Sequence, residues 1–63
     1  MHPDFYVVNH GSIFVLTPLT EAAQGWVAEH LPPDAPTWGD SIVVEHRFIG
    51  EIVAGFTADG LKL

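Results

Sequence analysis

The sequence predicts an α+β fold, in which a small, mostly antiparallel sheet of three or four strands has two helices on one face, in the order ββαβα. Short runs rich in β-branched and aromatic residues lie at 5–8, 12–16 and 41–45. Longer runs with apolar residues at helical spacing lie at 19–31 and 47–58. Such a set of elements is typical of helices packed on one side of a sheet. With 63 residues, the chain is expected to form a single domain, 1–63.

The first two strands are expected to form a hairpin. "FYVV" (5–8) and "SIFVL" (12–16) are separated by "NHG" (9–11), and a three-residue gap that ends in glycine is typical of a hairpin turn. "SIVVE" (41–45) is predicted as a third strand, and "LKL" (61–63) either forms a short fourth strand or trails off. If the second and third strands are parallel, the helix between them makes a right-handed crossover.

The first helix is predicted to begin within "TPLT", where Thr17 or Thr20 caps it and Pro18 tolerates a first-turn position. Apolar residues then recur with helical periodicity, which indicates an amphipathic helix of about three turns. This stripe consists of Leu19, Ala22, Ala23, Trp26, Val27 and Leu31.

The prolines at 32–33 end this helix, because proline cannot donate to the helix ladder. Residues 34–40 are expected to form a loop. The second helix is predicted from about residue 47 to residue 58. Gly60 is expected to act as its left-handed C-terminal cap, with Leu61 folding back onto the helix.

Two glycines inside the second helix need a reason, because glycine there costs roughly 1 kcal/mol relative to alanine. Gly55 lies at the edge of the buried arc, where the two helices are expected to approach closely. Gly50, Ala54 and Ala58 form a smooth stripe that points away from the core. That stripe is either plain helix surface or a second interface, at which a partner or a second copy docks.

Composition limits the classes of function. Eight acidic residues against two basic ones give a net charge of −6, which argues against direct binding to nucleic acid or an anionic membrane and favours a basic partner. The chain has no cysteine, so disulfides and thiolate zinc sites are excluded, and a reducing cytoplasm is the expected location. No signal peptide and no apolar run of roughly 20 residues is recognised, so no membrane association is expected.

Four acidic residues are expected at one pole of the fold. Both helices are predicted to follow strands that run the same way, so their C-terminal ends fall together, near Glu29, Asp34, Asp40 and Asp59. Two interpretations are favoured: solvated carboxylates that a surface needs, or an anionic patch that engages a basic groove. A cation site formed by the same carboxylates is the third and least favoured, since no calcium-loop spacing is present. A duplex carries one charge per ~1.7 Å of axis, so only a clustered face competes for a phosphate-binding site.

Trp38 lies in the proline-rich segment after the first helix, between Thr37 and Gly39. It either folds down as a lid on the core or is exposed as an aromatic anchor, a residue type common at binding hot spots.

No catalytic or metal-binding pattern stands out. The four histidines show no paired ligand spacing, and His30 is expected to be packed or half-buried on the first helix. Ser12 and Ser41 begin strands without a nucleophile motif around them. The chain is therefore expected not to be an enzyme, with no cofactor and no metal.

Two segments carry a resemblance: "GSIFVLTPLTEAAQGWVAEHLP" and "GDSIVVEHRFIGEIVAGFTADGL". Together they resemble a group of short, acidic bacterial and phage proteins. In size and acidity the chain is similar to anti-CRISPR proteins, in particular those acting on type I-C systems. The resemblance implies a DNA-mimic type of inhibitor that occupies a DNA-binding surface of a CRISPR surveillance complex without catalysis.

The leading hypothesis is therefore an acidic, non-enzymatic inhibitor of a basic, nucleic-acid-handling protein, acting as a monomer or a weak homodimer. Its expected binding residues are Glu29, Asp34, Trp38, Asp40 and Asp59. The alternatives are a structural or regulatory module that acts as a homodimer or a subunit, through Gly50, Ala54 and Ala58, and an antitoxin-like inhibitor of a basic protein.

Overall fold

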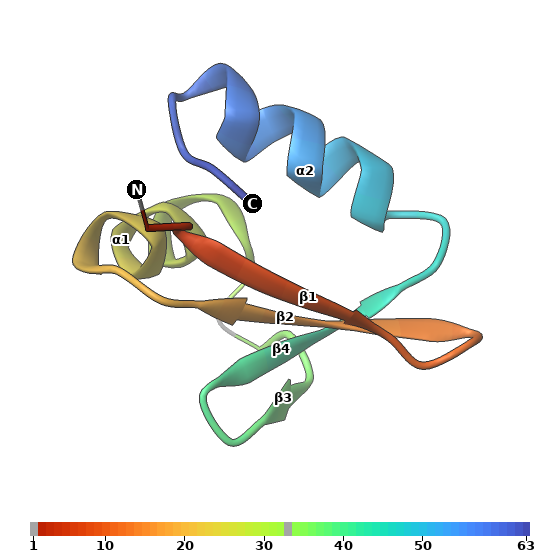
Figure 1. Ribbon diagram of the computed structural model, residues 1–63. Helices are drawn as coiled ribbons and strands as arrows, with labels where there is room; N and C mark the ends of the chain where they lie inside the picture. Colours follow the sequence, from red (N-terminus) through yellow and green to blue (C-terminus); the bar gives the residue numbers. More distant parts are fainter. Residues whose placement is uncertain (1, 33) are drawn as a thin grey trace.

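Four strands and two helices make up the part of the chain that the computed structural model describes, residues 2–32 and 34–63 (Figure 1). The elements are β1 Phe5–Asn9, β2 Ile13–Pro18, α1 Glu21–His30, β3 Thr37–Trp38, β4 Ser41–Glu45 and α2 Ile49–Ala58. The sheet has the order β1-β2-β4-β3, and every pair of neighbours is antiparallel. The predicted α+β class is confirmed, and the order of elements differs from ββαβα only by the short strand β3.

The first hairpin forms as predicted, around residues 9–11. The side-chain oxygen of Asn9 accepts a hydrogen bond from the Gly11 N–H at 2.8 Å, and the His10 N–H donates to the Ile13 carbonyl at 2.8 Å. Gly11 has φ +89°, a left-handed conformation that glycine adopts without steric cost.

The fourth strand comes from a segment that the sequence predicts as a loop. Within 34–40, Thr37 pairs with Ile42 and Trp38 pairs with Ser41, so β3 and β4 form a second hairpin. Residues 61–63 are not part of the sheet. Instead the Lys62 carbonyl accepts hydrogen bonds from the backbone N–H groups of Asp4 and Phe5, which holds the two chain ends side by side (Figure 1).

Of the two predicted caps of α1, Thr20 is the one used. Its hydroxyl oxygen accepts a hydrogen bond from the Ala23 N–H at 3.1 Å and donates to Asp4 Oδ1 at 2.8 Å. The placement of Pro18 in the first helical turn is wrong. Pro18 ends β2 opposite Phe5, because pairing with β1 keeps the chain extended up to that point.

The predicted stripe of α1 is buried only in part. Ala23 and Trp26 are buried, and Val27 and Leu31 pack against the core. Leu19 precedes the helix and is exposed, as is Ala22.

The C-terminal end of α2 is a Schellman cap, as the sequence predicts. Gly60 has φ +88°, its N–H donates to the Thr57 carbonyl at 3.0 Å, and the Leu61 N–H donates to the Phe56 carbonyl at 2.9 Å. Leu61 packs against the core. The helix begins at Ile49 rather than near residue 47.

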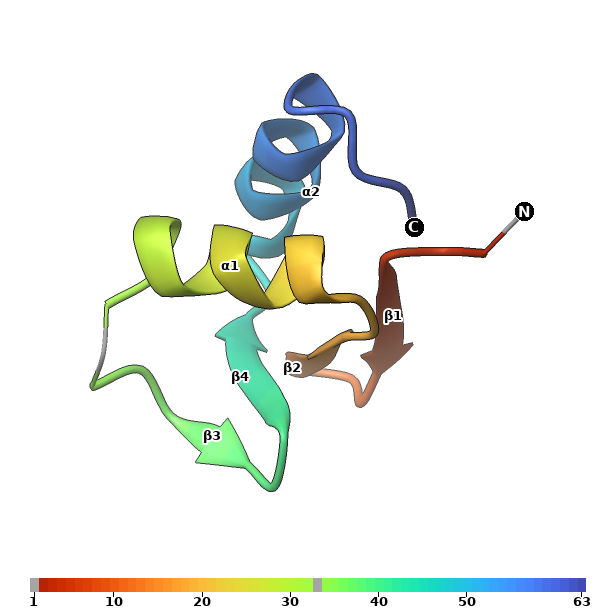
Figure 2. The same cartoon turned by 90° about the vertical axis from the view of Figure 1, so that its left-hand side faces the viewer.

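The expectation that both helices follow strands running the same way is wrong. β2 and β4 are antiparallel neighbours, with Val15 opposite Val43, so α1 makes no crossover between parallel strands. The physical reason is the β3–β4 hairpin, which turns the chain back before β4 begins. β4 therefore starts beside the end of β2, and α2 runs back over the sheet towards α1 (Figures 1 and 2).

Three aromatic rings form the centre of the core, on the helix side of the sheet. Phe5 stacks on Phe56 with ring centres 4.1 Å apart, and Trp26 meets both rings edge-on, at 6.1 and 5.8 Å. Alternating residues of β2 and β4, among them Leu16 and Ile42, point to the same side. The other face of the sheet carries no helix (Figure 2).

Candidate protein-binding surfaces

The end of the molecule where β2 stops gathers three of the four predicted acidic residues. Asp40 lies in the turn before β4, Glu29 in the last turn of α1 and Asp59 just after α2, and the three segments lie at this end (Figures 1 and 2). The strand direction used to predict this pole is wrong, yet these residues still share one end, because α2 returns to α1.

Asp59 has a contact within the fold as well as a place on this surface. Its Oδ2 accepts a hydrogen bond from Trp26 Nε1 at 2.7 Å and lies 3.8 Å from His30 Nε2. His30 stacks on the Trp26 ring, with centres 4.3 Å apart, so it is packed as one of the two expectations had it, although the residue is exposed. Asp59 therefore ties the end of α2 to the buried tryptophan of α1.

The four predicted carboxylates do not converge on one cluster. Glu29 and Asp59 line one shallow hollow between the helices. Asp40 lines a second hollow, beside Thr17 and Ser41. Asp34 lines a third, which runs along α2. The acidic surface is thus spread over three neighbouring depressions rather than one patch.

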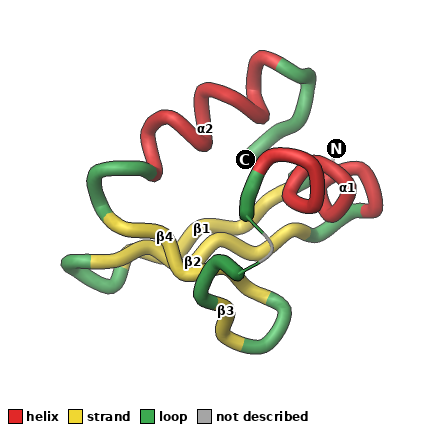
Figure 3. Tube along the Cα trace, turned by 180° about the vertical axis from the view of Figure 1, so that it is seen from behind, coloured by secondary structure: helices red, strands yellow, loops and turns green. Residues whose placement is uncertain are grey.

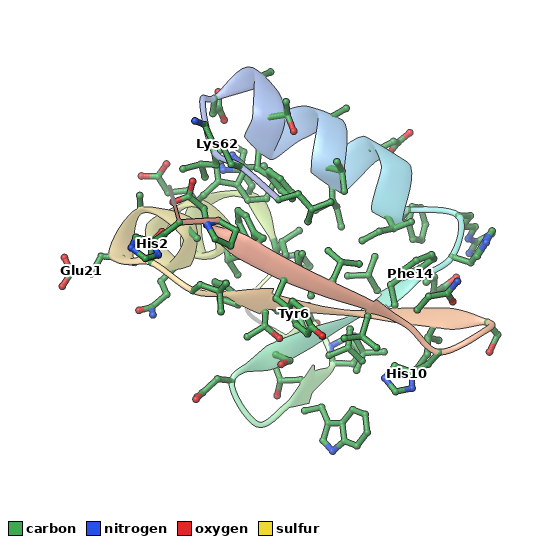
Figure 4. The ribbon with its side chains drawn as sticks, viewed as in Figure 1. His2, Tyr6, His10, Phe14, Glu21 and Lys62 are labelled. Atoms are coloured by element: carbon green, nitrogen blue, oxygen red, sulfur yellow. The ribbon has the colours of Figure 1, made fainter. Side chains whose placement is uncertain are left out.

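Trp38 does not close over the core. It lies on the edge strand β3 with 63 % of its surface exposed, and its ring centre is 5.9 Å from that of His10. Tyr6, on the sheet face without helices, is 59 % exposed and was not identified from the sequence. Figure 4 shows Tyr6 and His10 on the side of the sheet opposite to Phe14 and α2.

The two glycines of α2 have different surroundings. A Cβ atom at Gly55 would lie 3.2 Å from Trp26 Cζ2. Gly55 therefore makes room for the indole ring of α1, rather than for the close approach of the two helices that the sequence predicts. A Cβ atom at Gly50 would meet nothing within 4 Å, and Gly50, Ala54 and Ala58 are all exposed. Packing within the described chain therefore explains Gly55 and leaves Gly50 without a steric reason.

A groove that sequence reasoning missed is lined by residues of α2, β4 and the segment after α1. Figure 3 shows how these three parts of the backbone are arranged. Its volume is about 530 Å³, and Ile42, Val44 and Ile52 are among its apolar lining. Phe48, which is 44 % exposed, also lines it. We call this hollow the α2–β4 groove.

Three carboxylates belong to the α2–β4 groove: Asp34, Glu45 and Glu51. All three residues are exposed. The one signal in the sequence was Glu51, a large polar group on the otherwise small outer face of α2. That Asp34 lines the same groove depends on the path of the chain after α1.

The charge is too sparse to imitate a duplex along the whole molecule. The longest dimension is 29 Å, over which a B-form duplex carries about 17 phosphate charges. The chain has eight acidic and two basic residues. Apolar contacts must therefore supplement charge in any tight complex with a nucleic-acid-binding surface.

Within the described residues, no group of three or more histidine, cysteine or acidic side chains is placed to hold a metal ion. Neither helix of that part of the chain has the length and hydrophobicity required to cross a bilayer. Comparisons with protein-family models, with curated proteins and with solved structures found no match to this chain.

Proposed function

We propose that this protein is a non-catalytic, acidic binding protein that inhibits a basic, nucleic-acid-handling protein by covering its nucleic-acid-binding surface. The observation that supports the proposal is that nearly all of the acidic groups are exposed while one of the two basic side chains is paired within the chain. All acidic residues except Asp4 are exposed, and Arg47 is already paired with Glu45 at 3.1 Å. A surface of this kind attracts a positively charged groove and accelerates its association.

The exposed aromatic residues supply the second component. Trp38 lies on the edge strand β3, just before the turn that carries Asp40. A tryptophan in a desolvated contact often dominates the binding energy. Glu29, Asp34, Asp40 and Asp59 provide the charge that steers the partner, while Trp38 provides apolar contact.

The particular form of this proposal is an anti-CRISPR protein, as the resemblance in size and acidity implies. The partner is then a type I-C surveillance complex, and the inhibitor occupies a surface that otherwise binds target DNA. Inhibition follows from steric and electrostatic exclusion, so no bond in the partner is made or broken.

The test measures binding of target DNA to the purified type I-C complex, with and without this protein, at rising ionic strength. The inhibitor is expected to lower DNA binding, and its own affinity for the complex is expected to fall as salt rises, because exposed charges are screened beyond about 8 Å at physiological salt. Asp34→Asn and Asp40→Asn are each expected to weaken it more than Glu21→Gln. Unchanged DNA binding, or salt-independent association, would contradict the proposal.

A second candidate, a homodimer formed through Gly50, Ala54 and Ala58, is favoured by the open space at Gly50. Light scattering after gel filtration measures the mass directly. A dimer that Gly50→Glu converts to a monomer supports this candidate, whereas a monomer at all concentrations rejects it.

A further inference from the structure

The α2–β4 groove combines apolar side chains with carboxylates. Ile42 and Val44 line it as buried residues, Ile52 is partly exposed, and Phe48 adds a half-exposed ring. A hollow of about 530 Å³ falls within the range of sites that accept several side-chain-sized groups. The groove therefore offers apolar burial in addition to charge.

The carboxylates of the groove favour an occupant with positive charge. Asp34 and Glu51 make no ion pair and no side-chain hydrogen bond within the described residues. Glu45 is bound by a single guanidinium, that of Arg47. A segment that places positive charge beside apolar side chains complements all of these groups at once.

Two residues that line the groove already bind an arginine of this chain, Arg47, which is not itself part of the lining. Arg47 Nε donates to Glu45 Oε2 at 3.1 Å, and its guanidinium carbon lies 4.9 Å from the centre of the Phe48 ring. Glu45 and Phe48 both line the groove. A carboxylate beside an aromatic face is a favourable site for arginine, which stacks and forms hydrogen bonds with the same group.

Charge disfavours a second copy of this chain as the occupant. Each copy has a net charge of −6 and only Arg47 and Lys62 as basic residues. Bringing two such molecules together at Asp34 and Glu51 would oppose like charges at close range, which disfavours the pairing. The occupant must come from a partner with the opposite charge.

We propose that the α2–β4 groove binds an amphipathic cationic segment of the partner, in which arginine alternates with aliphatic side chains. This inference rests on the proposed function, since it identifies where that partner docks. The aliphatic side chains lie against Val44, Ile52 and Phe48, and the guanidinium groups pair with Asp34 and Glu51.

The charge part of the proposal has a matched control within the chain. Glu51 lies in the first turn of α2, and Glu21 lies in the first turn of α1. Glu51→Gln and Glu21→Gln therefore each remove one charge from the first turn of a helix, but only Glu51 lines the groove. Figure 4 shows Glu21 pointing away from the body of the protein. Glu51→Gln is expected to weaken binding about three- to fivefold and Glu21→Gln less than about twofold.

The apolar part has a second matched pair. Phe48 and Tyr6 are both exposed aromatic residues. Phe48 is the N-cap residue of α2 and lines the groove, whereas Tyr6 lies on the side of the sheet opposite to α2 (Figure 4). Phe48→Ala is expected to weaken binding about tenfold, and Tyr6→Ala to leave it unchanged. Both variants are expected to stay folded, because each side chain is far from fully buried, and circular dichroism checks this.

The probe is a short synthetic peptide in which arginine and leucine alternate, added to the full chain and followed by amide chemical-shift changes. Changes centred on residues 48–52 and 42–45, lost when glutamate replaces arginine or serine replaces leucine in the peptide, are the expected result. No binding, binding centred on the end that carries Glu29 and Asp40, or equal effects of Glu51→Gln and Glu21→Gln would overturn the proposal.

The two proposals fail separately. If the complete partner binds in a salt-dependent manner but Phe48→Ala and Glu51→Gln behave like their controls, the groove assignment is wrong and the proposed function stands. If the peptide occupies the groove but DNA binding by the type I-C complex is unchanged, that function is wrong and the groove remains a cationic-segment site.

Discussion

The two ends of α2 differ in how they meet the rest of the protein. At the C-terminal end, Phe56 is fully buried between Phe5 and Trp26, and Asp59 accepts a hydrogen bond from the Trp26 indole. At the N-terminal end, Phe48 is 44 % exposed and no side chain caps the helix. One helix therefore closes the core at one end and leaves an apolar groove at the other.

The reason for the difference is the position of α1. It lies near the C-terminal end of α2 (Figure 2), where the Trp26 ring is so close to Gly55 that an added Cβ atom would be 3.2 Å from Cζ2. The groove lined by Phe48 and Ile52 has residues of β4 and of the segment after α1 on its other sides. The comparison indicates that stability is concentrated at one end and that accessible binding surface is available at the other.

The largest expected difference in stability is between alanine variants of Phe56, inside α2, and Phe48, its N-cap. Phe56→Ala is expected to cost about 3–5 kcal/mol, because it removes a fully buried ring and leaves a cavity. A chain of this length has only about 3–5 kcal/mol of stability from a single core, so this variant is expected to be largely unfolded. Phe48→Ala is expected to cost less than about 1 kcal/mol. Urea unfolding followed by tryptophan fluorescence measures both, and similar losses would contradict the comparison.

A smaller effect on stability is expected from removing the hydrogen bond that Trp26 of α1 donates to Asp59, just after α2. Asp59→Ala leaves the Trp26 N–H without its acceptor, which is expected to lower the free energy of unfolding by about 1–2 kcal/mol. The estimate is at the lower end for a charged acceptor, since the Asp59 side chain is 53 % exposed. Asp40→Ala, which removes a carboxylate without such a bond, is expected to change stability by less than about 0.5 kcal/mol. Equal effects of the two changes in thermal unfolding would show that this bond is unimportant.

The smallest expected effect on stability is the difference between alanine substitutions at Gly25 and Gly55. Gly25→Ala is expected to raise the free energy of unfolding by about 0.5–1 kcal/mol, because the added methyl group meets nothing within 4 Å and alanine favours the helix. Gly55→Ala adds a Cβ atom 3.2 Å from Trp26 Cζ2, so it is expected to be about 1 kcal/mol less favourable than Gly25→Ala. Chemical denaturation of both variants measures the difference. If Gly55→Ala stabilises as much as Gly25→Ala, the helices do not constrain each other at this point.

Parts of the candidate site were predictable, and parts were not. The exposure of Glu29, Asp34 and Asp40 follows from their position at element ends, which is a local property. The α2–β4 groove was not predictable, because Asp34 and Glu51 are distant in sequence and line the same groove only through the path of the chain after α1. Likewise the sequence left Trp38 either buried or exposed. Its pairing with Ser41 is local, but the place of β3 at the edge of the sheet depends on the long-range pairing of β4 with β2.

By itself the sequence determined the elements with strong local signals. The glycine-containing turn at 9–11, the cap at Thr20 and the Schellman cap at Gly60 are short-range features, stabilised by hydrogen bonds between neighbouring residues. Only the tertiary structure decided the direction of β4 relative to β2, the extended conformation of Pro18 and the use of 37–38 as a strand. These depend on which backbone groups pair across the sheet and on how Trp26 fills the space beside Gly55, and neither is encoded in the periodicity of a single segment.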